Sequence, residues 1–142
     1  MYSSGTLNIS NSTIAANEAG QPGALPGDGT GIGGGIYCSY QSQPTIVLMN
    51  NIIWANRSYD MTGGYKEQIA LSGHPLQPLT GITFNCIQYY HYLGAYPPEI
   101  YDPNANIDDN PEFVQDPNIA VDDFGDLHLK KDSPCINAGL PN

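Results

Sequence analysis

The chain has 142 residues, which is enough for one domain with a core of its own. It contains 16 glycines, 12 prolines and 10 tyrosines but only 4 basic and 14 acidic residues, a composition typical of short strands and turns rather than of helices. The net charge of −10 argues against a nucleic-acid partner and against a basic helix at a membrane surface, because so few cationic side chains could contact phosphates.

The first strong signal along the chain is an internal repeat. Residues 7–17 and 46–56 match position for position at a constant offset of 39 residues. In each copy aliphatic residues alternate, as in a strand with one buried face, and asparagines follow at the same places. A repeated strand-and-turn unit predicts a parallel β-solenoid, in which each coil buries its apolar face only when the next coil stacks on it.

The repeated asparagines define a candidate structural ladder. Asparagine tolerates the left-handed turn conformation, and its amide can pair with an identical amide one layer away. The common spacing therefore predicts that Asn11 stacks near Asn50 and that Asn17 stacks near Asn56.

The remaining sequence divides into insertions, a third copy and a tail. Segments rich in glycine and proline, about 20–35 and 59–80, are expected to be loop insertions between coils. Residues 81–87 resemble the start of another copy, with the asparagine one place early. We expect coils over 1–95 and an acidic segment over 96–142 that caps the solenoid, with residues 127–129 pairing beside the last coil. The longest apolar runs are too short to cross a bilayer, so no membrane insertion is expected.

Several phrases in the chain resemble a known family. They are GGIYC at 34–38, NNIIWAN at 50–56, NPEFV at 110–114, GDLHL at 125–129 and SPCINAG at 133–139. They are similar to bacterial right-handed parallel β-helix proteins of the pectate-lyase-like superfamily, in particular to secreted or surface members with a choice-of-anchor type of tail. The resemblance implies an all-β right-handed parallel β-helix and an extracellular or cell-surface location. Because the chain begins within a repeat and shows no signal peptide, we expect it to be the C-terminal part of a longer protein.

The three cysteines, Cys38, Cys86 and Cys135, allow at most one disulfide within the chain. Buried thiols acting as small apolar side chains are one interpretation. A bridge from Cys86 to Cys135, which would tie the tail to the last coil, is the other. Metal ligation is disfavoured because no Cys-x-x-Cys pair or Cys/His cluster is present.

Two further groups of residues are candidates for ligand contact. Clustered carboxylates suit Ca²⁺, which makes Asp122, Asp123 and Asp126 candidate calcium ligands, although a solvated acidic surface is the alternative. Flat aromatic rings can stack on sugars or seal the end of a core. The aromatic candidates for contact with a glycan or a protein partner are Trp54, Tyr89, Tyr90, Tyr92 and Tyr96.

The sequence assigns no catalytic residue. Glycosidases need converging carboxylates and lyases of this fold need a base, yet Arg57 is the only basic residue on a recognisable coil. We therefore interpret the chain as a non-catalytic extracellular β-helix that acts as a structural stalk or as a surface for a polysaccharide or a cell-surface protein. The alternative is the C-terminal part of a polysaccharide lyase or glycoside hydrolase whose catalytic coils lie upstream, so whether the parent protein is an enzyme stays open. No cofactor other than calcium is suggested, and the sequence assigns no oligomeric state.

Overall fold

The computed structural model describes residues 6–20, 34–39, 45–58, 68–72, 81–88 and 106–139. In these residues the regular structure is all-β apart from one 3-10 turn, Ile119–Val121. The strands stack in parallel and in register as in a parallel β-helix, which confirms the expected fold class. In this part of the chain no helix is long and apolar enough to cross a membrane.

In the described residues, four parallel sheets build the coils. The first contains β1 (Thr6–Ser10), β5 (Thr45–Met49) and β9 (Ile82–Thr83), and the second contains β2 (Thr13–Ala15), β6 (Ile52–Trp54) and β10 (Cys86–Ile87). The two shorter sheets pair β3 (Glu18–Ala19) with β7 (Arg57–Ser58) and β4 (Ile36–Ser39) with β8 (Ile69–Ser72).

The register follows the sequence repeat. Leu7 lies opposite Ile46 and Thr13 lies opposite Ile52, so the first two sheets keep the 39-residue offset read from the sequence. The segment 59–80, expected to be an insertion, contains β8, which completes the second coil by pairing with β4. Most of the two expected insertions lies outside the described residues.

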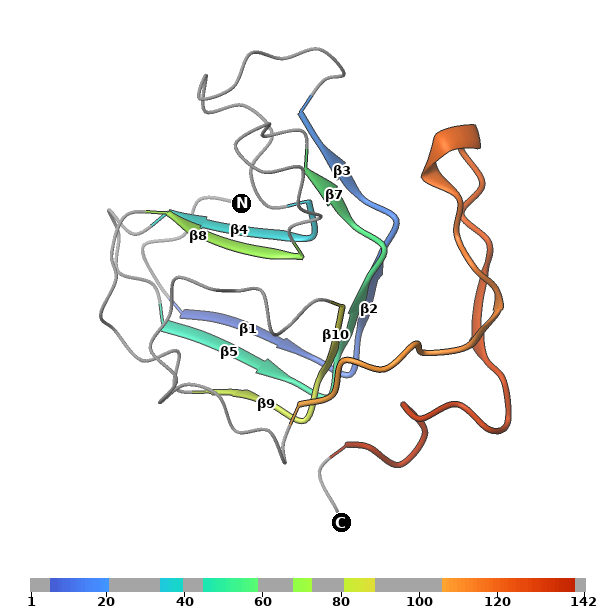
Figure 1. Ribbon diagram of the computed structural model, residues 1–142. Coiled ribbons are helices and arrows are strands. Elements are labelled where there is room, and N and C mark those ends of the chain that lie inside the picture. Colours follow the sequence, from blue (N-terminus) through green and yellow to red (C-terminus); the bar gives the residue numbers. More distant parts are fainter. Residues whose placement is uncertain are drawn as a thin grey trace.

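The core lies between the sheets. Figure 1 shows β4 and β8 across the interior from β1, β5 and β9, with β2 and β10 closing one side. Inward aliphatic side chains from all of these sheets form one buried cluster, and burial of such side chains stabilises the fold. Its members are Ile36, Ile46, Leu48, Ile53, Ile69, Ile82 and Ile87, with Leu7, Ile9 and Ile14 packed against them.

Each coil turns its first corner through one residue in the left-handed conformation. This residue is Asn11 in the first coil (φ 51°), Asn50 in the second (φ 57°) and Phe84 in the third (φ 60°). Asn85 therefore aligns with Asn51 rather than with Asn50, and the expectation that the third asparagine comes one place early is wrong. The alignment was missed because a bulky residue rarely adopts this conformation.

The tail forms an antiparallel hairpin outside the coils. β11 (Phe113–Gln115) pairs with β12 (Asp126–Leu129), so the expectation that residues 127–129 pair beside the last coil is wrong. Ile107 instead makes a parallel bridge to Cys86, with backbone hydrogen bonds of 2.8 and 2.9 Å to Asn85 and Ile87. Ile107 therefore occupies the edge of β10. Figure 1 shows the hairpin beside the coils.

Candidate functional site

A ladder of buried amides runs through the first corner of the coils. The backbone N–H of Ser12 donates to Oδ1 of Asn51 (3.1 Å), the N–H of Asn51 donates to Oδ1 of Asn85 (3.0 Å), and the N–H of Asn85 donates to Oδ1 of Asn106 (3.0 Å). Each bond crosses from one layer to the next. The three asparagines are at most 4% exposed, so water does not compete for these bonds.

The donor ends of the same amides are satisfied as regularly as the acceptor ends. Asn51 Nδ2 donates to the carbonyl oxygen of Ile9 and to Oδ1 of Asn85, both at 3.0 Å. Asn85 and Asn106 repeat this pattern by donating to carbonyl oxygens of the coil above them, at 3.0 and 2.8 Å. A buried polar group without a partner is costly, and this periodic satisfaction allows a polar row inside the fold.

A second ladder lies at the next corner, where Ala16 and Ala55 are in the left-handed conformation (φ 57° and 54°). Asn56 Oδ1 accepts from the N–H (3.0 Å) and Nδ2 (2.9 Å) of Asn17, while Asn56 Nδ2 donates to Oε1 of Gln68 (2.8 Å). Gln68 continues the row by donating to Oε1 of Gln88 at 3.3 Å. Asn56 is 0% exposed and Gln68 is 1% exposed.

The four asparagines singled out from the sequence differ in their positions. Asn50 Nδ2 donates to Asn11 Oδ1 at 3.3 Å in an exposed contact at the outside of the corner, whereas Asn17 and Asn56 bond within the second ladder. Four buried ladder members are not among the residues that the sequence singles out: Asn51, Asn85, Asn106 and Gln68. Asn51 and Asn85 share a signal, since each is an amide directly after a left-handed corner residue, Asn50 and Phe84.

Two oppositely charged residues lie opposite each other in the sheet formed by β3 and β7. Arg57 in β7 lies opposite Glu18 in β3, with Nη1 and Oε2 3.6 Å apart and both side chains partly exposed. An exposed ion pair of this kind stabilises weakly, by at most about 1 kcal/mol. The one basic residue expected on a coil therefore contributes to coil stacking.

The acidic residues of the tail support local turns. Asp123 accepts from Nε2 of Gln115 (2.8 Å) and from the N–H of Gly125 (2.9 Å), and Asp126 accepts from the N–H of His128 (3.1 Å). Hydrogen bonds from the side chain and backbone of His128 lower the pKa of Asp126. Among the described residues, no three His, Cys, Asp or Glu side chains form a group that could hold a metal, so Asp122, Asp123 and Asp126 do not converge. Calcium binding by these residues stays a sequence-based prediction.

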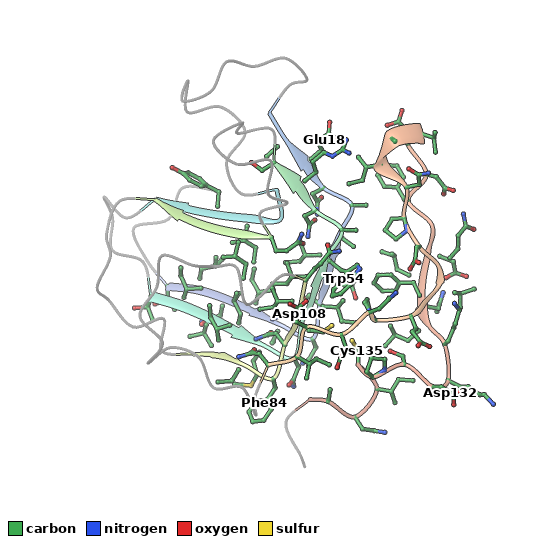
Figure 2. All side chains as sticks on the ribbon, viewed as in Figure 1. Glu18, Trp54, Phe84, Asp108, Asp132 and Cys135 are labelled. Atoms are coloured by element: carbon green, nitrogen blue, oxygen red, sulfur yellow. The ribbon has the colours of Figure 1, made fainter. Side chains whose placement is uncertain are left out.

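Of the aromatic candidates, Trp54 is the one that the structure describes. It is partly buried and follows the fully buried Ile53 in β6, so its side chain points away from the core. Figure 2 places it on the side of the coils nearest the hairpin. Tyr89, Tyr90, Tyr92 and Tyr96 lie outside the described residues, and their contact with a glycan or partner stays a prediction.

The tail meets the last coil around two cysteines. Cys86 in β10 is buried and Cys135 in the tail is partly buried; both are free thiols, and each lies close enough to shift the pKa of the other. The neighbouring Cys135 thiol and burial raise the pKa of Cys86, whereas the neighbouring Cys86 thiol lowers the pKa of Cys135. A small hollow of about 120 Å³ is lined by Asn50, Asn51, Ile52, Phe84, Cys86, Cys135, Ala138 and Gly139.

Comparison of the chain with protein-family models, with curated proteins and with solved structures gave no match. The structure itself defines the class of the protein, a parallel β-helix solenoid with buried amide ladders.

Proposed function

We propose that this chain is a non-catalytic structural module, a stalk made of β-helix coils. The observation that carries the proposal is the pair of buried amide ladders, which connect every described coil to its neighbour. Interlocked coils resist bending and shear because each layer is fixed by backbone bonds and by side-chain amides at two corners. A rigid rod is the property that a stalk requires.

The charged groups that could perform chemistry have structural roles in this arrangement. Arg57, the one basic residue expected on a recognisable coil, forms an ion pair with Glu18 between coils. The carboxylates of Asp123 and Asp126 accept hydrogen bonds from neighbouring turns of the tail. These contacts favour a scaffold over the alternative, which is the C-terminal part of a polysaccharide lyase or glycoside hydrolase.

The proposed setting is the cell surface or the medium. Its support is the resemblance of the repeats and of the SPCINAG tail at 133–139 to secreted pectate-lyase-like β-helix proteins. In that setting the outer face of the coils, which carries Trp54, is the proposed contact surface for a polysaccharide or a cell-surface protein.

The test is a turnover assay on the full chain with pectin, alginate and a neutral polysaccharide, following unsaturated uronides and new reducing ends. We expect no product. Arg57→Ala and Glu18→Ala form a matched pair, because both break the same ion pair but only the first removes the cation. If the chain releases product, and Arg57→Ala abolishes this release while Glu18→Ala retains it, the stalk proposal is wrong and the lyase alternative holds.

A further inference from the structure

We propose that Cys86 and Cys135 form a disulfide that clasps the C-terminal tail onto the last coil. The proposal is independent of whether the module is a stalk or part of an enzyme. It identifies the pair as a site of oxidative modification and gives the tail a covalent attachment to the coils.

The positions of the two cysteines beside their common hollow are each fixed by hydrogen bonds, first on the coil side. Cys86 is 3% exposed, and its backbone N–H donates to the carbonyl oxygen of Asn51 (2.8 Å) within the sheet. Its Sγ lies 3.2 Å from the carbonyl oxygen of Asp109, in the segment that leads from the last coil to the hairpin. The sulfur is therefore held at the junction between coil and tail.

Cys135 is held by a turn that is itself anchored. Its backbone N–H donates to Oγ of Ser133 (3.1 Å), and the hydroxyl of the buried Ser133 donates to the carbonyl oxygen of Pro111. Near the same turn, Gly139 packs beside the Asn50 side chain. Figure 2 shows Cys135 on the tail where it approaches the coils. Both cysteines line the same hollow of about 120 Å³, so the two side chains share one small space in which their sulfurs can meet.

The two thiols differ in the way that ordered disulfide exchange requires. Cys135 is partly exposed and its pKa is lowered, so it is the thiol that reacts first with a disulfide oxidant such as oxidised glutathione. Its thiolate attacks one glutathione sulfur, forms a mixed disulfide and releases a glutathione thiolate. Cys86 then loses its proton and attacks the Cys135 sulfur, releasing the second glutathione. In sum, two protein thiols are oxidised to one disulfide and one oxidised glutathione is reduced to two thiols.

The sequence allows an unambiguous assignment of the link. Trypsin cleaves after Arg57, Lys66, Lys130 and Lys131, so the three cysteines fall in the separate peptides 1–57, 67–130 and 132–142. The full chain is incubated with oxidised glutathione, alkylated, digested without reductant and analysed by mass spectrometry. We expect peptides 67–130 and 132–142 to be recovered as one linked species.

The stability readout uses matched cysteine variants. Oxidation is expected to raise the melting temperature by roughly 10 °C, because the closed ring contains the whole hairpin. Cys135→Ser should abolish both the link and the rise, while Cys38→Ser in β4 should preserve both. A link that involves Cys38, a glutathione adduct that persists on Cys135, or a link that leaves the melting temperature unchanged would overturn the proposal.

Discussion

In the coils, the backbone N–H after a corner is satisfied by an amide from the next layer, which lies 34 or 39 residues away for Asn51 and Ser12. In the tail, the corresponding bonds span two residues, as from Gly125 to Asp123 and from His128 to Asp126. The coil bonds are buried or partly buried, whereas these tail bonds are exposed. The coil corners therefore depend on their neighbours, while the tail turns can form from local sequence alone.

The apolar residues divide in the same way. Core aliphatics of the coils such as Leu48 and Ile53 are 0% exposed, but in the tail Val121 and Phe124 are each 67% exposed. Among the described tail residues, Phe113 is a large apolar side chain that is fully buried, at 1% exposure. The difference indicates that the stability of the module comes mainly from the coils, and that substitutions of the same type should cost more there.

The largest expected difference between the two regions is for asparagine truncation. Asn56→Ala removes the acceptor for Asn17 and the donor to the carbonyl oxygen of Ile14 in a site that is 0% exposed, and should lower the free energy of unfolding by about 3 to 5 kcal/mol. Asn118→Ala removes one exposed cap of the 3-10 turn and should cost at most about 1 kcal/mol. Urea unfolding of both variants measures the difference, and equal losses would contradict the comparison.

A smaller difference is expected for added methyl groups. A Cβ at Gly34 would lie 2.6 Å from the carbonyl carbon and 2.7 Å from the nitrogen of Arg57, in the backbone of β7, so Gly34→Ala should cost about 2 to 3 kcal/mol. A Cβ at Gly139 in the tail meets Oδ1 of the Asn50 side chain at 3.1 Å, and this side chain can shift. Thermal unfolding should therefore show a clear loss for Gly34→Ala and little for Gly139→Ala; the reverse order would place the rigid packing in the tail.

The smallest expected effect is the response of the tail to pH. Because His128 lowers the pKa of Asp126, the contribution of this pair is fully present above the usual aspartate pKa of about 3.9 and is lost as the pH falls through the lowered value. A carbon NMR titration of the Asp126 carboxyl should show the low pKa, and His128→Ala should return it toward the usual value. An unchanged titration in the variant would show that the His128 side chain does not lower the pKa of Asp126.

The strands and register of the first two coils could be predicted from the sequence, because residues that stack in successive coils are separated by a constant number of residues. Leu7 and Ile46, for example, are partners both in the repeat and in the sheet. The third copy was misaligned at Asn85 because Phe84 occupies the corner where the first two coils have asparagine. The repeat predicts position reliably only where the corner chemistry is also repeated.

The ladder members outside the clear repeats could not be predicted. Asn106 and Gln68 come from segments with no matching copy in the sequence. Each contributes one amide, which accepts a hydrogen bond from the neighbouring ladder member, Asn85 or Asn56. The partner of β12 was also missed, because the sequence gives no sign that Ile107 occupies the edge of β10. Contacts of this kind depend on the length and path of the segments between the coils, and residue type alone does not determine that path.

The central claim, that buried amides hold the coils together, is tested most directly by a double-mutant cycle on Asn51 and Asn85. Asn85 Oδ1 accepts from both the N–H and Nδ2 of Asn51 at 3.0 Å. Urea unfolding of Asn51→Ala, Asn85→Ala and the double variant gives the coupling energy between the two side chains. We predict a coupling of about 1 to 3 kcal/mol. Each truncation alone breaks the hydrogen bond between the two side chains, so the second truncation costs less when the first is already present. A coupling near zero would contradict the claim and leave aliphatic packing as the force that joins the coils.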